Sequence, residues 1–351
     1  MPVPIASVTC AGRVPWVQDV GGGGGGSPEP AIAVAHNTTP FITAYPWSAG
    51  YGVKYTNPGT LPIGGGLSVA FSPSGATIAV AHSTTPYITA YPWGAGFGTK
   101  YADPGTLPPN TGRGVAFSPS ETTIAVAHDS SPYVTAYPWS SGFGTKYTNP
   151  GTLPTGTGYG VAFSPSGAAV AVAHSTTPCV TAYPWSSGFG TKYADPGTLP
   201  TSVSYGVAFS PSGAAVAINS LITPCVLIYP WSSGFGSKYA NPGTLPTGTG
   251  NGVTFSSSGA AVAVAHTTTP YVSAYPWSSG FGTKYTNPGT LPTGTGYGVA
   301  FSPNGAAVAV AHDHSPFITA YPWSAGFGVK YTNPGTLPPS IGRGVAFSPV
   351  V

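Results

Sequence analysis

The tripeptide Tyr-Pro-Trp returns along this chain at a fixed interval of 46 residues. Its tryptophans stand at positions 47, 93, 139, 185, 231, 277 and 323, with no insertion between any two of them. A constant period of this size is typical of repeat architectures, in which each unit packs against its neighbours. The sequence therefore predicts seven stacked units rather than several unrelated domains.

Each unit holds four short segments of strand type, separated by turn residues. In the fourth unit these segments are residues 160–165, 169–174, 179–185 and 189–193. Small and large side chains alternate along the first two segments, so each sheet should have one flat face and one ridged face. Four strands in each of seven units predict an all-β fold, a seven-bladed β-propeller of four-stranded blades.

The segment Val-Ala-Phe-Ser-Pro-Ser-Gly, followed by a small-residue strand and a strand ending in Trp, resembles the WD-repeat and related propellers over residues 31–351. The chain departs from that family because it lacks the Gly-His pair and the Trp-Asp dipeptide. Its near-identical tandem blades are also similar to repetitive bacterial and phage propeller proteins. That resemblance implies a virion or cell-surface location.

The two ends of the chain indicate how the ring closes. The first unit lacks its first strand, and a matching segment appears at residues 344–349. This C-terminal strand should complete the first blade and remove the open sheet edges. Residues 31–351 are therefore predicted to form the propeller, and residues 1–30 an N-terminal arm whose six glycines at 21–26 act as a flexible linker.

Composition excludes two classes of partner. Only 5% of the residues are charged, and the net charge of +3 comes from scattered side chains. Nucleic-acid binding requires a basic stripe that neutralises phosphates, and the chain has none. No apolar run approaches the length of a membrane-spanning helix, so we expect no membrane insertion.

Histidine ends the second strand of six units, and Ser220 replaces it in the fifth. A metal shared between these histidines is not expected, because adjacent blades should lie about 10 Å apart and ligand bonds are only about 2 Å long. We expect each imidazole to bond the Ser/Thr-rich turn beside it, and no metal or cofactor. The sequence His312-Asp313-His314 is the one local cluster with ligand chemistry. Cys179 and Cys225 should be free and buried, because the blade spacing exceeds disulfide reach.

Catalysis is not predicted. The chain has seven carboxylates, and no two fall at positions expected to converge on the central channel. Sugar-lactonase propellers need acidic metal ligands around that channel, and no such set is evident here. The sequence therefore predicts that the protein is not an enzyme.

The first strands begin with residues that differ from one unit to the next. These residues should ring one mouth of the channel and bind a ligand or partner; they are Arg113, Tyr159, Tyr205, Asn251, Tyr297 and Arg343. Tyr and Arg are enriched in recognition surfaces. The alternative is that Arg113 simply pairs with Asp129 at the adjacent strand end.

The fifth unit breaks the pattern with apolar residues. Leu221 and Ile222 occupy a turn that is polar elsewhere, and exposed apolar pairs often mark contact sites. We expect this turn to touch another chain or the arm. Together these features favour a non-catalytic structural or attachment protein, such as a phage virion component tethered through residues 1–30. The alternative is a lectin-like glycan-binding propeller that uses the Tyr/Arg ring.

Overall fold

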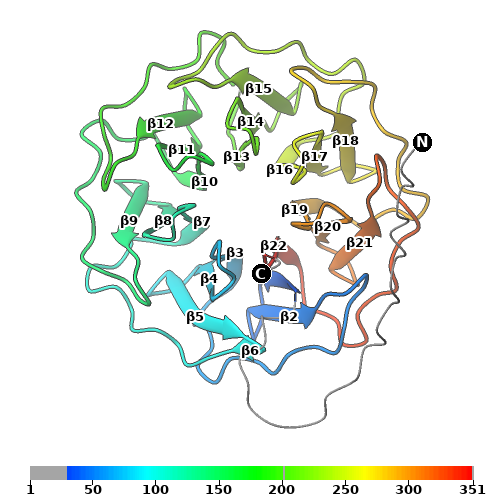
Figure 1. Cartoon of the computed structure of the whole chain (residues 1–351), viewed down its shortest axis with the longest axis horizontal. Coiled ribbons are helices and arrows are strands. Elements are labelled where there is room, and N and C mark those ends of the chain that lie inside the picture. The colour runs from blue at the N-terminus through cyan, green and yellow to red at the C-terminus, as the bar shows by residue number, and fades with distance from the viewer. Residues whose placement is uncertain (1–29, 201, 350–351) are drawn as a thin grey trace, which may run out of the picture.

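The computed structural model describes residues 30–200 and 202–349, which form seven antiparallel sheets arranged radially around a central axis. Figure 1 shows the ring in this view, with the sheets following one another in sequence order. The protein is a seven-bladed β-propeller, as the repeat predicts. No helix in these two ranges is long and apolar enough to cross a membrane.

The blades are numbered in sequence order from blade one, which contains β22, β1 and β2, and all of them share one order of strands. The inner strands are β22 (Gly342–Phe347), β3 (Gly66–Phe71), β7 (Gly112–Phe117), β10 (Gly158–Phe163), β13 (Val207–Phe209), β16 (Gly250–Phe255) and β19 (Gly296–Phe301). The middle strands are β1 (Ala31–His36), β4 (Thr77–His82), β8 (Thr123–His128), β11 (Ala169–His174), β14 (Ala215–Asn219), β17 (Ala261–His266) and β20 (Ala307–His312). The outer strands are β2 (Ile42–Pro46), β5 (Ile88–Gly94), β9 (Val134–Pro138), β12 (Val180–Pro184), β15 (Val226–Pro230), β18 (Val272–Pro276) and β21 (Ile318–Pro322).

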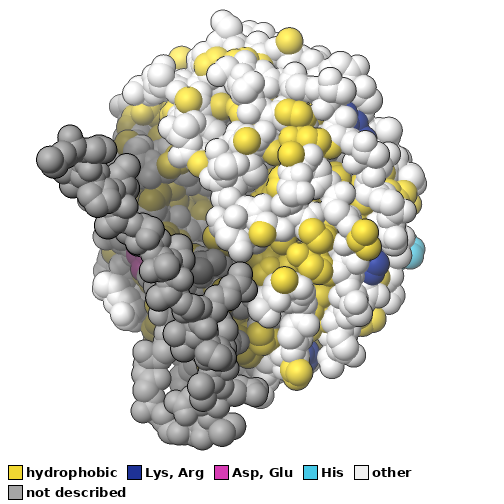
Figure 2. Space-filling model, turned by 45° about the vertical axis from the view of Figure 1, so that its right-hand side comes forward, with side chains coloured by type: hydrophobic (Ala, Val, Ile, Leu, Met, Phe, Trp, Pro, Cys, Tyr) yellow, Lys and Arg dark blue, Asp and Glu magenta, His cyan; other side chains and the backbone are white. Residues whose placement is uncertain are grey.

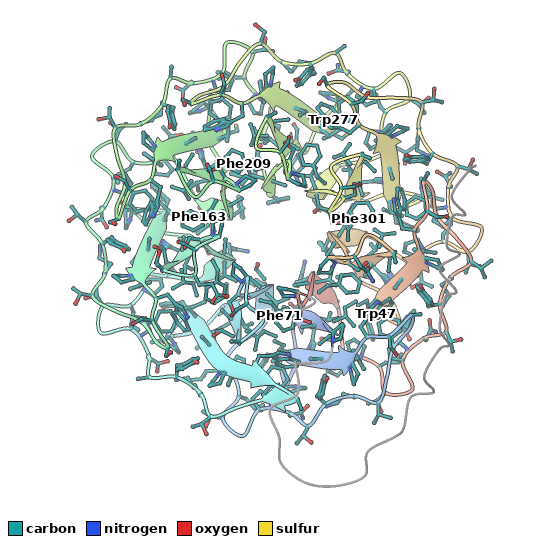
Figure 3. All side chains as sticks on the ribbon, in the orientation of Figure 1. Trp47, Phe71, Phe163, Phe209, Trp277 and Phe301 are labelled. Atoms are coloured by element: carbon teal, nitrogen blue, oxygen red, sulfur yellow. The ribbon has the colours of Figure 1, made fainter. Side chains whose placement is uncertain are left out.

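Alternation of small and large residues builds the core between the blades. The alanines of β11, at 169, 171 and 173, pack against Val216, Ile218 and Tyr229 of the next blade. Because successive side chains point to opposite faces, the valines of β11 pack against the preceding blade instead. In Figure 3 the labelled Phe163 and Phe301 lie nearer the central opening than Trp277 does. The predicted flat and ridged faces are confirmed.

The expected fourth strand of each blade is not confirmed. In the described residues only one blade has it, as β6 (Gly96–Phe97), and the other six show single bridges such as Trp185 to Phe189. Every outer strand contains a proline opposite the next segment, Pro184 in blade four and Pro92 in the blade that has β6. The Gly190 N–H donates to the Pro184 carbonyl at 2.9 Å, but Pro184 has no N–H to return the bond. The proline therefore limits this pairing in all seven blades and does not by itself decide which blade has a fourth strand.

Ring closure occurs as predicted. Strand β22 pairs antiparallel with β1, with Val345 opposite Val34, so the C-terminal strand completes the first blade. The predicted arm, residues 1–30, lies outside the described residues except for Pro30, whose carbonyl accepts a hydrogen bond from the Trp47 N–H at 2.7 Å.

Candidate functional site at the mouth of the central channel

The inner strands enclose a cavity of about 670 Å³ at one mouth of the channel. All six residues predicted to ring this mouth line the cavity; they are Arg113, Tyr159, Tyr205, Asn251, Tyr297 and Arg343. Each of them stands two residues before the valine of its own inner strand. Because the blades repeat every 46 residues around the ring, residues at this position lie at the same height along the channel. Their placement follows from the repeat, whereas their binding role stays a prediction.

Arg113 forms an ion pair with Asp129, the residue that follows β8 in the same blade. Its Nε and Nη2 donate to the two carboxylate oxygens at 2.7 and 2.9 Å. Hydrogen bonding to Asp129 raises the pKa of the Arg113 guanidinium above its usual value. Such a forked pair fixes both side chains at the edge of the cavity. The predicted alternative, in which Arg113 pairs with Asp129, is therefore confirmed, and Arg113 also lines the cavity.

Arg343 has a different environment. Its Nε donates to the Asn37 side-chain oxygen at 3.2 Å, and its guanidinium lies 4.4 Å from the centre of the Tyr297 ring. Among the described residues it forms no ion pair with a carboxylate. The cavity therefore carries one guanidinium that is neutralised by an acid and one that is not.

The aromatic residues form the other part of the wall. Tyr159 and Tyr205 meet edge to face with ring centres 4.6 Å apart, and Arg113 lies over Tyr159 at 5.5 Å. Burial raises the pKa of the Tyr159 hydroxyl, so it is a proton donor at neutral pH. Asn251 donates from Nδ2 to the Gly296 carbonyl at 2.8 Å, which leaves its side-chain oxygen as an acceptor.

Blade five has a distorted inner strand, and sequence reasoning missed the cause. Ser204 replaces a glycine found at this position in the other six blades. In blade four, for example, a Cβ at Gly158 would overlap the Tyr133 carbonyl oxygen of the preceding blade. The inner strand of blade five accordingly begins only at Val207, whereas the six others begin at the glycine itself and pair from there.

Asn219 takes over the lost backbone pairing, at a position that is alanine in the other blades. Its side-chain oxygen accepts the N–H groups of Tyr205 and Gly206 at 2.8 Å each, and Nδ2 donates to the Gly250 carbonyl at 2.9 Å. Asn219 thereby positions Tyr205 at the cavity. The signal was present in the sequence as two paired departures from the repeat, Ser204 and Asn219.

Leu221 and Ile222 lie at the predicted end of the ring. Leu221 lines the cavity, and Ile222 is 51% exposed beside it. The expected contact with another chain or with residues 1–29 falls outside the described residues and stays a prediction. The cavity position of Leu221 was not foreseen from the sequence.

The six histidines at the ends of the middle strands are buried, and each makes a side-chain contact that the prediction did not include. The Nε2 of His174 lies 2.9 Å from the Thr181 hydroxyl on the adjacent outer strand, not on the neighbouring turn. The same arrangement recurs in the other five. An imidazole at the end of one strand reaches across the ladder to the hydroxyl facing it. Burial lowers the pKa of His174, and a backbone hydrogen bond with the turn residue Thr176 also acts on it, so the expected turn contact accompanies the bond across the ladder.

The remaining polar clusters do not assemble into a second site. His312 is buried and bonded to Thr319, whereas His314 is exposed and its Nδ1 lies 2.7 Å from Asp313. The described residues hold no group of three or more potential metal ligands. Cys179 and Cys225 are free and buried, as expected.

No protein-family model and no curated sequence matches the chain, whereas many solved structures share its fold. The periplasmic gluconolactonase of Pseudomonas aeruginosa is 15% identical with a TM-score of 0.69, over 92% of this chain and 100% of that one. A "putative 6-phosphogluconolactonase" of Bacteroides uniformis is 14% identical with a TM-score of 0.66, over 91% and 99%. A second one, of Bacteroides fragilis, is 13% identical with a TM-score of 0.69, over 91% and 98%.

These likenesses correct two predictions. The expectation of a non-catalytic structural or attachment protein from a phage, with a lectin-like module as the alternative, is contradicted by similar structures named as lactonases. So is the conclusion that the chain is not an enzyme. That conclusion assumed that no two acids converge on the channel; in the structure one acid, Asp129, contacts the cavity residue Arg113. The WD-repeat and phage resemblance is likewise unsupported beyond the propeller repeat.

Proposed function

We propose that this protein hydrolyses a small lactone in the cavity at the channel mouth. The observation that carries the proposal is the presence of Arg343, a guanidinium with no carboxylate partner among the described residues, in a cavity that is also lined by Arg113, the ion-pair partner of Asp129. The similar structures named as gluconolactonases support the same class of reaction.

Arg343 suits the role of an electrophile. In lactone hydrolysis water adds to the carbonyl carbon, and negative charge develops on the carbonyl oxygen before the ring C–O bond breaks. A fixed guanidinium stabilises that charge better than it stabilises the neutral lactone, which lowers the barrier. The Tyr297 ring and Asn37 hold Arg343 in place for this purpose.

Asp129 suits the role of general base. Of the five described carboxylates it alone bonds a side chain that lines the cavity. A carboxylate has about four lone-pair sites, so Asp129 can accept a proton from water while it holds Arg113. The proton then passes to the ring oxygen as the C–O bond breaks, which gives the open hydroxy acid. Tyr159 and Tyr205 offer flat apolar contact to the lactone ring.

The test is hydrolysis of glucono-δ-lactone, followed against the spontaneous rate. Arg343→Gln is expected to lower kcat by about 10²–10³-fold, as loss of an oxyanion donor does in other hydrolases. Asp129→Asn is expected to lower kcat by about 10²-fold or more, because the amide cannot accept a proton from water.

Glu121→Gln is the matched control, because Glu121 bonds the Ser74 N–H of a neighbouring blade and does not line the cavity. It should retain the wild-type rate, and thermal unfolding should verify that all three variants are folded. Hydrolysis of no lactone above the spontaneous rate, or equal rates in folded Arg343→Gln and wild-type protein, would refute the proposal.

A further inference from the structure

Blade five places an apolar group at the cavity where other blades are mostly polar. Val203 and Leu221 are linked by a backbone hydrogen bond from the Leu221 N–H to the Val203 carbonyl at 3.2 Å. Ile222 follows, 51% exposed. At the position of Leu221 the other six blades carry Asn, Ser, Asp, Ser, Thr and Asp, and at the position of Ile222 they carry only Thr, Ser or His.

The group forms a continuous path from the cavity to the surface. Leu221 lines the cavity itself, and Ile222 is the next residue outward on the same turn. Two features of this blade maintain the path. Leu227 is buried at the position of the hydroxyl residue of the other blades, and Ser220 stands at the position of their histidine. Asn219 supports the displaced inner strand beside it.

The apolar path lies across the channel from the cationic wall. Arg343 and Arg113 belong to blades one and three, which flank blade two, and the inner strands are adjacent in the order of the sequence. Blade five is three blades from blade two in one direction and four in the other (Figure 1). A ligand held at Arg343 can therefore extend across the cavity toward Leu221.

The cavity has room for such a ligand. Its volume of about 670 Å³ lies in the range of about 300–1,000 Å³ that accommodates drug-sized molecules, and exceeds what a single six-membered ring occupies. On the face of the ring shown in Figure 2, the coloured Lys, Arg, Asp and Glu side chains are few and lie apart from one another.

We propose that the substrate is a lactone carrying an alkyl or acyl chain, which leaves the cavity along Val203, Leu221 and Ile222. The inference that the substrate contains a lactone rests on the proposed hydrolysis. The inference that the substrate carries an apolar chain rests on the apolar path alone. The carbonyl of the lactone meets Arg343, and the chain lies on blade five.

The test uses δ-lactams with alkyl chains from methyl to heptyl at the carbon next to the ring nitrogen, because their amide bond resists hydrolysis. Calorimetric titration measures their affinity for the full chain. Each added methylene that reaches Leu221 or Ile222 should tighten binding by about fourfold. The double variant Leu221→Thr with Ile222→Thr should remove most of this chain-length effect.

A matched control makes conservative changes in the equivalent turn of blade four. Ser175→Thr with Thr176→Ser keeps that turn polar, and neither residue lines the cavity. This control should show the wild-type gain per methylene. The ratio of heptyl to methyl affinity is compared within each protein, so a general loss of binding does not imitate the expected result.

Affinity that is independent of chain length in the wild type would overturn the proposal. So would an equal gain per methylene in folded double variant and wild type. If the double variant instead loses binding to a protein chain but keeps the lactam series unchanged, the turn is a protein contact and the proposal is wrong. A chain-length effect that depends on Leu221 and Ile222, in a protein that hydrolyses no lactone, would support the tail site and refute the hydrolase.

Discussion

The Nε2 atom of His82 lies 2.9 Å from the hydroxyl oxygen of Thr89, across the ladder that joins β4 to β5. His82 is fully buried, and burial lowers the pKa of its imidazole from 6.5 to about 4. The other five strand-end histidines show the same lowering for the same first cause. In blade five, Ser220 and Leu227 occupy the two positions and no imidazole is present.

These histidines should make the ring sensitive to acid. Above pH 6.5 they are neutral in both folded and unfolded chains, so they contribute no pH dependence. Between pH 6.5 and about 4 the unfolded chain binds protons that the folded chain excludes, so the free energy of unfolding falls as the pH falls. Each histidine contributes up to about 3 kcal/mol to this loss of unfolding free energy, which is the equivalent of its pKa shift. Urea unfolding at pH 7 and pH 5 measures the loss; equal stability at both values would contradict this reading.

Blade five suggests a variant that removes one of the six. His128→Ser combined with Thr135→Leu copies the Ser220 and Leu227 arrangement into blade three. The double variant should unfold with a smaller loss of stability between pH 7 and pH 5 than the wild type, by about one histidine's share. His128→Ser alone should be less stable at pH 7, because it leaves the buried Thr135 hydroxyl unpaired and a cavity beside it. An unchanged pH dependence in the folded double variant would show that His128 titrates normally.

The repeat was sufficient to predict much of the fold, for reasons that particular residues make clear. The fixed interval of 46 residues gave seven blades, and the unmatched segment near Gly344 gave the closure that pairs β22 with β1. Residues at one repeat position must lie at the same height along the channel, so the sequence was sufficient to predict that the set from Arg113 to Arg343 surrounds its mouth.

What the sequence could not supply was pairing between residues at unlike positions. The bond from His82 to Thr89 depends on strand register, which the sequence does not give. The pair of Arg113 with Asp129 was predicted only as the alternative to ligand binding. The sequence analysis predicted a fourth strand in every blade. Whether that segment pairs as a strand depends on which backbone groups face it, and the Pro184 carbonyl accepts one bond from Gly190 but Pro184 has no N–H to return. Catalysis was not predicted because no two acids fall at converging repeat positions, and that argument did not consider an acid held by a cavity residue, as Asp129 is by Arg113.

The glycine that begins most inner strands should be sensitive to a single methyl group. A Cβ at Gly112 would overlap the carbonyl oxygen of Tyr87 in the preceding blade. Gly112→Ala is therefore expected to lower the free energy of unfolding by about 1–3 kcal/mol, as overpacking does. Gly105→Ala is the control, because a Cβ there meets no atom within 4 Å, and its effect should stay within about 1 kcal/mol. Equal melting temperatures for the two alanine variants would show that the neighbouring blade moves aside without a loss of stability.

The converse change, Ser204→Gly, should lengthen the inner strand of blade five. Amide hydrogen exchange at Tyr205 and Gly206 would detect this as slower exchange.

The ring is closed by side chains as well as by the backbone of β22. Phe347, at the end of that strand, is 8% exposed and meets Trp47 edge to face with ring centres 5.1 Å apart. It also belongs to the core cluster shared by blades one and seven. Phe347→Ala should lower the free energy of unfolding by about 3–5 kcal/mol, because it empties part of the interface that joins the first and last segments of the chain.

Deletion of residues 344–351 should have a larger effect than Phe347→Ala, because β1 would lose its inner partner and blade one would expose a sheet edge. Leu337→Ala serves as the control for a change near the same end of the chain, since Leu337 is 36% exposed and should cost less than about 1 kcal/mol. Thermal unfolding of the three variants ranks them. If the truncated protein melts at the wild-type temperature, the contact between β22 and β1 does not hold the ring closed; if it melts well below Phe347→Ala, backbone pairing adds to the contribution of the aromatic contact.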